Sequence, residues 1–410
     1  MISNFERYTK RDDNYFFSHH PVNGGLEEER MTSKPIRLLY MIWDGTLGGI
    51  ASNLADFVRN VEPDRYHITV CLLSQSGSAI NSLKGPNVRV VEMRATSGLD
   101  FKAFLRFLRF LRSNQFDLIH NNTRTYFGHL ALIFTTRGVP RLYQEHGGLH
   151  TEGDLRRSYF SYRLFGYFYD AFLTVSDSTM RCIEQAGVSA HRITNIGNPI
   201  DFEYFKPQLL KVDAKRKLGF SPYSPVVGTA CRFVHQKDLP LFLRTAKEIC
   251  SCMPDVHFAL AGGGPNEPML RNLVAKLGIQ SVVHFVGIRS DMPVVFRAFD
   301  VFLLTSYQES FGKTILECLA SATPIIAVVP SFGGGKQIVE QATGILFTYQ
   351  RNSEALAKLA MSLLSDPYRG EEMGKSGRLW VLGQTEFHVE KWAERLQEVY
   401  ARLLHPSMPR

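Results

Sequence analysis

Short runs of hydrophobic and β-branched residues alternate with longer amphipathic stretches along most of the chain. One set of runs begins at residues 36, 67, 88, 117, 141, 171 and 193, and a second set begins at 226, 256, 282, 301, 324 and 344. The runs have the length of strands and the stretches between them that of helices, which predicts repeated βαβ units. The expected fold class is therefore α/β, with two doubly wound Rossmann-like domains in sequence.

The pattern breaks between the two sets and at both ends of the chain. Residues 206–225 contain several prolines and lysines, which predicts a linker between a first domain, 35–205, and a second, 226–385. Residues 1–34 are polar and without periodicity, so a flexible arm is expected there. Residues 386–410 have a helical pattern, and we expect this helix to pack back toward the first domain. An active site is expected between the domains, at the carboxyl ends of their strands.

Composition and charge narrow the function classes. No apolar run among the 410 residues approaches the ~20 that would span a bilayer, and the N-terminus lacks a secretory-signal pattern. A cytoplasmic, non-integral protein is therefore expected. The net charge of +8 favours anionic partners, but no nucleic-acid-binding motif is visible, so nucleic acid is not expected among them. The six cysteines form no metal-binding pattern, and reduced thiols are expected.

The segment after the strand at 301 carries the most informative chemistry. Glu309 is predicted in a strand-to-helix loop, and Glu317 lies in the helix that follows. Unpaired N–H groups and the helix dipole favour an anion at such a helix start, which comprises Phe311, Gly312, Lys313 and Thr314. Lys313 and Glu317 are also spaced for an ordinary surface ion pair, which would be worth little.

Two cations follow the first strand of the second domain. Arg232 falls just past the strand end and Lys237 five residues later. Taken alone, such a pair is more often solvated surface charge. Beside an anion-binding helix start of the same sheet, it suits a diphosphate. The glycine clusters at 262–264 and 333–335 add little by themselves, because glycine-rich loops are common in nucleotide-binding α/β folds.

Together these features resemble the GT4 family of GT-B glycosyltransferases, over about residues 36–404. The motifs are Arg232 with Lys237, the LAGGGP loop, ESFGKTILE and GGGKQIVEQATGILF. The resemblance implies a retaining glycosyltransferase that moves a sugar from a nucleoside diphosphate, with a UDP-sugar expected as donor. It places the donor on the second domain and a saccharide or lipid-linked acceptor on the first, in the synthesis of cell-surface polysaccharide or glycan.

The resemblance also implies roles for residues of the second domain. Arg232 and Lys237 would neutralise the donor diphosphate, and the backbone N–H groups of residues 311–314 would bind phosphate or sugar hydroxyls. Glu317 corresponds to the carboxylate that binds the ribose hydroxyls. Glu309 corresponds to the one that contacts the donor sugar near its reacting face and is, on this basis, a catalytic residue.

In the first domain the resemblance points to one histidine and one glycine pair. His146 would position the donor sugar, and it counts as the second catalytic candidate. Gly48 and Gly49 would let the backbone approach the phosphates. Two residues depart from the family pattern. Gln337 stands where a glutamate is usual, and Lys313 adds a positive charge where an apolar residue is common, which would strengthen the phosphate site or change sugar preference.

Neither a metal nor another cofactor is expected. The chain contains no Asp-x-Asp, so fixed cations would stabilise the leaving diphosphate. A glycosidase is disfavoured, because its two carboxyl groups must flank one bond, whereas Glu309 and Glu317 are predicted to address different parts of the donor. Two alternatives stay open: a GT-B-like isomerase or phosphorylase, and a catalytically inactive relative that serves as a binding subunit.

One stretch of the first domain suggests a further partner. Residues Phe101 to Arg112 read FKAFLRFLRFLR, which predicts a helix with a basic arc of about 120° and an otherwise apolar surface. Such a helix either covers the sheet with a solvated basic edge or lies on an anionic membrane surface. A peripheral position on the inner face of the membrane would suit a lipid-linked acceptor.

Overall fold

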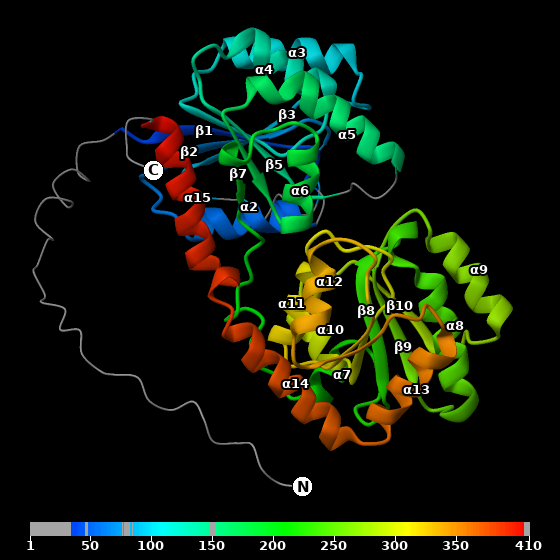
Figure 1. Cartoon of the computed structure of the whole chain (residues 1–410). Coiled ribbons are helices and arrows are strands. Elements are labelled where there is room, and N and C mark those ends of the chain that lie inside the picture. Colours follow the sequence, from blue (N-terminus) through cyan, green and yellow to red (C-terminus); the bar gives the residue numbers. More distant parts are fainter. Residues whose placement is uncertain are drawn as a thin grey trace, which may run out of the picture. The chain divides into compact units, whose positions relative to one another are not determined.

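The structure is a computed structural model that describes residues 34–405, apart from 46–47, 76, 78–82, 84 and 148–151; of residues 152–158 only the backbone is described. Residues 1–33 of the predicted arm lie outside the described residues. The remainder contains two parallel sheets, each with helices on its faces (Figure 1).

The first sheet has seven parallel strands in the order β3-β2-β1-β4-β5-β6-β7. Its strands are β1 (Ile36–Ile42), β2 (Tyr66–Leu72), β3 (Val88–Glu92), β4 (Leu118–Asn121), β5 (Arg141–Glu145), β6 (Ala171–Thr174) and β7 (Ile193–Asn195). The helices between them are α2 (Gly49–Arg59), α3 (Phe101–Arg112), α4 (Tyr126–Thr135), α5 (Glu152–Phe165) and α6 (Asp177–Gln185). The direction of winding reverses between β1 and β4, which is where such sheets bind ligands.

The second sheet has six parallel strands in the order β10-β9-β8-β11-β12-β13. They are β8 (Val226–Arg232), β9 (His257–Gly263), β10 (Val283–Gly287), β11 (Val301–Leu304), β12 (Ile325–Val328) and β13 (Ile345–Thr348). Its helices are α8 (Leu239–Cys252), α9 (Glu267–Leu277), α10 (Met292–Ala298), α11 (Lys313–Ala320), α12 (Gly334–Gln341), α13 (Ser353–Leu364) and α14 (Pro367–Leu382). The fold class expected from the sequence is confirmed, with the winding reversed between β8 and β11.

The apolar runs became strands because helices bury them on both faces. Strands β11 and β12, with the sequences VFLL and IIAV, are buried along their whole length. A continuous apolar run is typical of parallel strands for this reason. Gly228 in β8 is favoured for a steric reason, because a Cβ at this position would come within 2.3 Å of the Phe299 ring.

Two segments outside the strand pattern pack onto the sheets. The region 206–225, expected as a linker, contains α7 (Lys211–Lys217), which packs against α10, and the Lys215 ammonium lies 2.7 Å from Asp300. Helix α15 (Val389–Leu404) packs on the first sheet, where Tyr400 lies against Phe57. Short 3-10 turns lie at Gly166–Phe168, Ala190–Arg192, His235–Lys237 and Thr385–Phe387.

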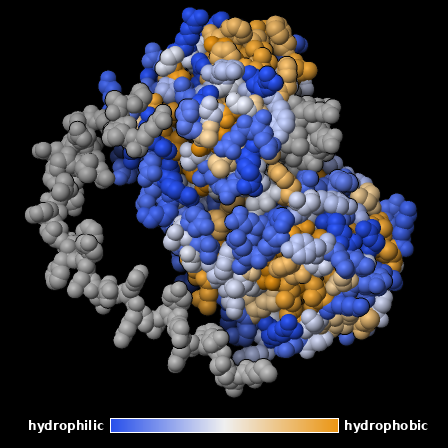
Figure 2. All heavy atoms as spheres, in the orientation of Figure 1, coloured by the Kyte–Doolittle hydropathy of each residue, from blue (hydrophilic) through white to orange (hydrophobic). Residues whose placement is uncertain are grey.

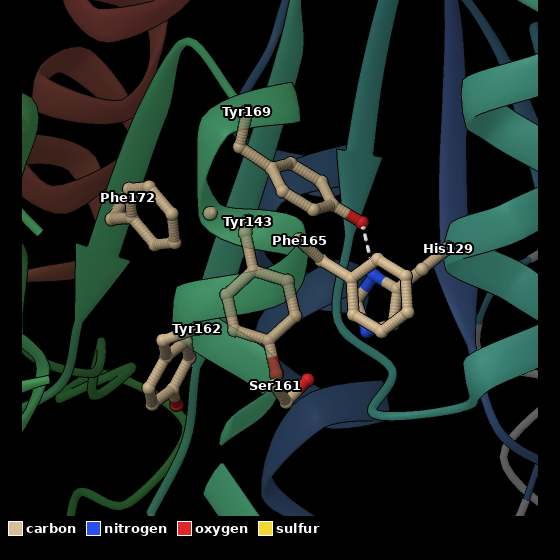
Figure 3. A pocket seen from close by; sticks show the side chains of 8 residues that line it. His129, Tyr143, Ser161, Tyr162, Phe165, Tyr169 and Phe172 are labelled. Atoms are coloured by element: carbon tan, nitrogen blue, oxygen red, sulfur yellow. Dashed lines mark hydrogen bonds between the residues drawn. The ribbon is translucent and has the colours of Figure 1, made fainter. Parts of the chain in front are cut away.

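An aromatic cluster fills the space between β5, β6, α4 and α5 (Figure 3). The Tyr169 hydroxyl accepts a hydrogen bond from Asn121 Nδ2 at 2.6 Å and therefore donates its own proton to His129 Nδ1, also at 2.6 Å. His129 is stacked on Phe165 with ring centroids 4.7 Å apart. Desolvation lowers the pKa of His129 to about 4, so its ring is neutral at pH 7.

His120 is a second buried, neutral histidine of the first sheet. Its Nδ1 lies 2.6 Å from the Tyr400 hydroxyl of α15, and desolvation lowers its pKa to about 3. In the folded chain both rings stay neutral, whereas a solvent-exposed histidine of the unfolded chain takes up a proton near pH 6.5.

These two histidines predict acid sensitivity. Between about pH 6.5 and pH 4 the unfolded chain binds protons that the folded chain does not. The free energy of unfolding should therefore decrease as the pH is lowered through this range, by up to about 1.4 kcal/mol per pH unit for each histidine. Urea denaturation at pH 7, 6 and 5 measures this slope. His129→Asn should flatten it, whereas the exposed His191→Asn should not. Equal stability at pH 7 and pH 5 would contradict the assignment.

Candidate functional site

Three of the predicted residues lie at the point where the second sheet reverses its winding. Arg232 ends β8, Lys237 ends the turn that follows, and Glu309 lies in the loop after the neighbouring strand β11. Lys237 Nζ donates to Glu309 Oε1 at 2.6 Å, and both side chains are largely buried. The same oxygen accepts from Ser306 Oγ at 2.7 Å. The Arg232 side chain is exposed and has no hydrogen-bond partner among the described residues.

A glycine loop holds Glu309 in place. The Glu309 N–H donates to Phe332 O at 3.1 Å, and Gly335 N–H donates to Glu309 O at 3.1 Å. A Cβ on Gly335 would lie 2.3 Å from Glu309 Cβ, and one on Gly333 would lie 1.8 Å from Glu309 O. Gly333 also has a φ of 105°, which favours glycine. These glycines gave only a weak signal in the sequence, because their partner lies more than twenty residues upstream.

Helix α11 starts beside this loop without a capping side chain. Gly312 precedes the helix with a φ of 93°, and no side chain hydrogen-bonds to the free N–H groups of the first turn. The start formed by Phe311, Gly312, Lys313 and Thr314 therefore keeps unpaired donors, which is the arrangement that binds phosphate groups. The Lys313 side chain points away from this helix start, and its Nζ lies among side chains of α2, at 2.6 Å from Ser52 Oγ.

Glu317 lies about one turn farther along α11. Burial raises its pKa, and the nearby positive charge of Lys313 acts in the opposite direction. Glu309 and Glu317 therefore have different surroundings: the first is neutralised directly by Lys237, while the second has no salt-bridge partner among the described residues. A hydroxyl pair, such as that of a ribose, would supply the hydrogen bonds that Glu317 lacks.

His146 follows β5 in the first sheet. Its Nε2 lies 2.7 Å from Asn122 Oδ1, an oxygen that also accepts weakly from the Tyr40 hydroxyl at 3.4 Å. With an acceptor at Nε2, that nitrogen carries the proton and Nδ1 is left as an acceptor. Desolvation lowers the pKa of His146 to about 4. The ring can therefore accept a hydrogen bond from a hydroxyl at pH 7 but does not serve as a cation.

A buried ionic network that the sequence did not suggest supports the His146 loop. Glu145 is paired with Arg124 and accepts from the Tyr162 hydroxyl and, at 2.9 Å, from Gly147 N–H. Arg124 also donates to Gly147 O at 2.7 Å. A Cβ on Gly147 would lie 1.9 Å from Ser310 Oγ, so this loop lies directly against the loop that carries Glu309.

Gly48 and Gly49 begin α2 after the first strand. Gly48 caps the helix with extended backbone, a φ of −178°, and no side chain caps the free N–H groups. Both glycines are exposed, and no atom lies within 4 Å of the position that a Cβ would take at either one. The backbone is thus open to a ligand at a second uncapped helix start.

The described residues therefore bring together two uncapped helix starts, an exposed arginine, a lysine–glutamate pair and a neutral histidine. This set suits a dianionic group joined to a hydroxyl-rich one, because the helix starts and cations bind the first and the carboxylates and imidazole bind the second. No group of three or more His, Cys, Asp or Glu side chains is placed to hold a metal ion within the described part of the chain.

Comparison with known proteins assigns both halves. Residues 211–380 match the family model described as "Glycosyl transferases group 1", and residues 47–204 match "Glycosyltransferase Family 4". Together the two models cover most of the chain.

Two curated relatives resemble the chain over about half its length. The lipopolysaccharide core biosynthesis mannosyltransferase LpsB of Rhizobium meliloti is 30% identical over 221 residues, which is 52% of this chain and 61% of the relative. A GDP-mannose-dependent phosphatidylinositol monomannoside mannosyltransferase of Corynebacterium glutamicum is 28% identical over 250 residues, 58% of this chain and 64% of the relative. The match spans less than two thirds of either relative.

Among solved structures, Anabaena HepE in complex with UDP and glucose superposes with a TM-score of 0.75 at 21% identity. The match covers 89% of this chain and 99% of HepE. At this identity the likeness concerns the fold, which in both proteins consists of two Rossmann-like halves.

The packing of Glu309 against the glycine loop predicts a local steric effect. Gly335→Ala should lower the free energy of unfolding by about 1–3 kcal/mol, because the new Cβ overlaps that of Glu309. Gly370→Ala in α14 is the matched control: its Cβ meets nothing closer than 3.8 Å, and stability should rise by up to about 1 kcal/mol. Urea denaturation compares the two, and an equal effect at both positions would contradict this packing.

Proposed function

Because the chain belongs to the GT4 group of glycosyltransferases, we propose that it transfers a sugar, with retention of configuration, from a nucleoside diphosphate to a saccharide or lipid-linked acceptor. The observation that carries the proposal is the cluster at the reversal of the second sheet. Arg232, Lys237 and the start of α11 lie beside Glu309 there, so that charge for a diphosphate and a carboxylate for a sugar occur together.

The donor is proposed to be a UDP-sugar. HepE, whose fold is similar, has been crystallised with UDP and glucose, whereas the Corynebacterium relative is named for GDP-mannose. The uncapped start of α11 fits the diphosphate of either nucleotide. Glu317 is assigned to the ribose hydroxyls, which both share, so the base must be distinguished elsewhere.

During transfer, the bond between the anomeric carbon and the diphosphate oxygen breaks, a bond from that carbon to an acceptor hydroxyl oxygen forms, and the hydroxyl proton passes to the leaving diphosphate. Negative charge builds up on the diphosphate as it leaves. Arg232 and the N–H groups of residues 311–314 are proposed to stabilise that charge, and one preorganised donor of this kind is worth about 3–4 kcal/mol. Lys237 donates a hydrogen bond to Glu309 and is proposed to hold that side chain in place beside the sugar. Neutral His146 is proposed to orient a sugar hydroxyl through Nδ1, and Gly48–Gly49 to bind phosphate through the backbone.

We propose that no metal is needed, since side chains and helix starts supply the positive charge. EDTA should then leave the release of UDP nearly unchanged. Loss of activity in EDTA that Mg²⁺ or Mn²⁺ restores would overturn this part of the proposal.

The acceptor side is proposed to approach an anionic membrane surface through α3 and α4. Figure 2 shows hydrophobic residues gathered over these helices. Phe101 is 67% exposed and Phe134 is 68% exposed. Ala103, Phe107 and Leu111 pack α3 on the sheet, so the helix both covers the sheet and presents apolar groups outward.

The basic residues of α3 are not equivalent in this proposal. Arg106 donates to the backbone oxygens of Met93 and Arg94, at 2.8 and 3.1 Å, and so has a structural partner. Arg109 and Arg112 are exposed and are proposed to bind lipid headgroups, each contributing about 1 kcal/mol to membrane binding. None of the described helices is long and apolar enough to cross a bilayer.

The nucleotide site is tested by titration calorimetry with UDP. Glu317→Ala and Arg232→Ala should each weaken binding about tenfold or more, because each removes a charged contact worth about 1.5–3 kcal/mol. Glu309→Gln should instead bind UDP nearly as well and lower turnover in a UDP-release assay over a panel of UDP-, GDP- and ADP-sugars. Unchanged nucleotide affinity in folded Glu317→Ala and Arg232→Ala would refute the placement of the site.

Membrane binding is tested by sedimentation with acidic vesicles. Arg109→Gln with Arg112→Gln should release the protein, as should Phe101→Ser with Phe134→Ser, while UDP affinity stays unchanged. High salt should weaken binding, since it shortens the reach of charge to ~3 Å at 1 M. Tyr368→Ser with Leu379→Ser changes exposed apolar residues of α14 and is the control. Equal sedimentation of all variants would reject this surface.

A further inference from the structure

Lys313 differs from the other cations of the candidate site because its side chain leaves the second sheet. It is the first residue of α11, yet its Nζ lies 2.6 Å from Ser52 Oγ, 3.0 Å from Asn53 Oδ1 and 3.2 Å from Asp56 Oδ2. An ammonium has three protons to donate, and here three acceptors of α2 face it. Its hydrogen-bonding capacity is therefore used without a ligand.

The partners of Lys313 are themselves fixed. Asn53 Nδ2 donates to Asn198 Oδ1 at 2.6 Å, which leaves Oδ1 facing Lys313. Asp56 also accepts from Arg59 at 2.5 Å. The side chains of Lys313 and Asp56 are only 13% and 6% exposed, so the ion pair is poorly screened by solvent.

The contact joins the beginnings of two helices. Ser52 belongs to the first turn of α2, where its N–H donates to Gly48 O at 3.0 Å, and Lys313 is the first residue of α11. Both helix starts carry a partial positive charge, so their approach is unfavourable unless negative charge lies nearby. Asp56, which also pairs with Arg59, supplies negative charge between the two helices.

We infer that Lys313 is a positioning residue that ties the first turn of α2, with Gly48 and Gly49, to the start of α11, rather than a ligand of the donor phosphates. The inference rests on the proposed donor site, because only there does the relative position of the two helix starts affect catalysis. It also assigns Asp56, Asn53 and Ser52, none of which the sequence pattern singled out.

A second effect follows from the same geometry. Glu317 lies four residues after Lys313. Burial raises its pKa, the lysine charge opposes that rise, and the Asp56 charge adds to it. Removing that charge should make Glu317 take up a proton at a higher pH. The variant should therefore lose UDP affinity at a higher pH than the wild type as the pH is lowered.

The decisive experiment is hydrogen exchange of the full chain without nucleotide. Lys313→Met and Asp56→Asn should each speed amide exchange across residues 49–56 by about tenfold, a factor within the range of coupled pairs. Amide exchange in the double variant should be no faster than in the faster of the two single variants, and Lys313→Arg should restore protection. The exposed Lys375→Met is the matched control. Unchanged exchange in both single variants, with melting curves showing folded protein, would overturn the tie.

Kinetics then separate the tie from phosphate binding. A tie predicts that Lys313→Met lowers kcat about tenfold and leaves the Kd for UDP at pH 8 within about threefold, with turnover recovered in Lys313→Arg. A phosphate ligand predicts the reverse: Lys313→Met weakens UDP binding as much as Arg232→Ala, and Asp56→Asn does not lower turnover. If the chain binds no UDP, the proposed donor is wrong while the exchange result still tests the tie; if it binds no nucleoside diphosphate at all, the proposed function fails.

Discussion

The pairing of Lys237 with Glu309 is the interaction on which the candidate site depends. A carboxylate this deeply buried is tolerated only when its charge is compensated, and the 2.6 Å contact to the ammonium does this. The charge pair alone would leave the loop free to move. The backbone is fixed as well, by hydrogen bonds between residues 307–310 and residues 331–335. Because the two cross-linked loops follow neighbouring strands β11 and β12, the parallel sheet gives the pair its position.

Much of this could be predicted from the sequence, because its causes are local. Apolar runs of strand length give parallel strands wherever helices cover both faces, and the motif ESFGKTILE places an uncapped helix start after β11 through its glycine alone. The resemblance to the GT4 family came from such local motifs and was confirmed by the family models. The assignments of individual site residues remain predictions that the proposed variants address.

What could not be predicted depends on partners that are distant in the sequence. Nothing near Lys313 indicates that its charge is matched by Asp56, more than 250 residues earlier. The network of Arg124, Glu145 and Tyr162 likewise corresponds to no recognisable spacing in the sequence. The region 206–225, predicted as a linker from its prolines, contains the helix α7, in which the buried Lys215 ammonium pairs with Asp300. In each case tertiary electrostatics decided what local pattern left open.

Helix α15 has a consequence for the order in which the protein is made. Its residues Trp392 and Tyr400 are fully buried in the core of the first sheet, and Tyr400 closes the hydrogen bond to His120. A ribosome that has finished the first half has therefore not yet made part of that half's core. The first sheet must wait, with apolar surface uncovered, until the second half has been synthesised, and such waiting intermediates are the species that chaperones bind. The two halves are thus coupled in biogenesis.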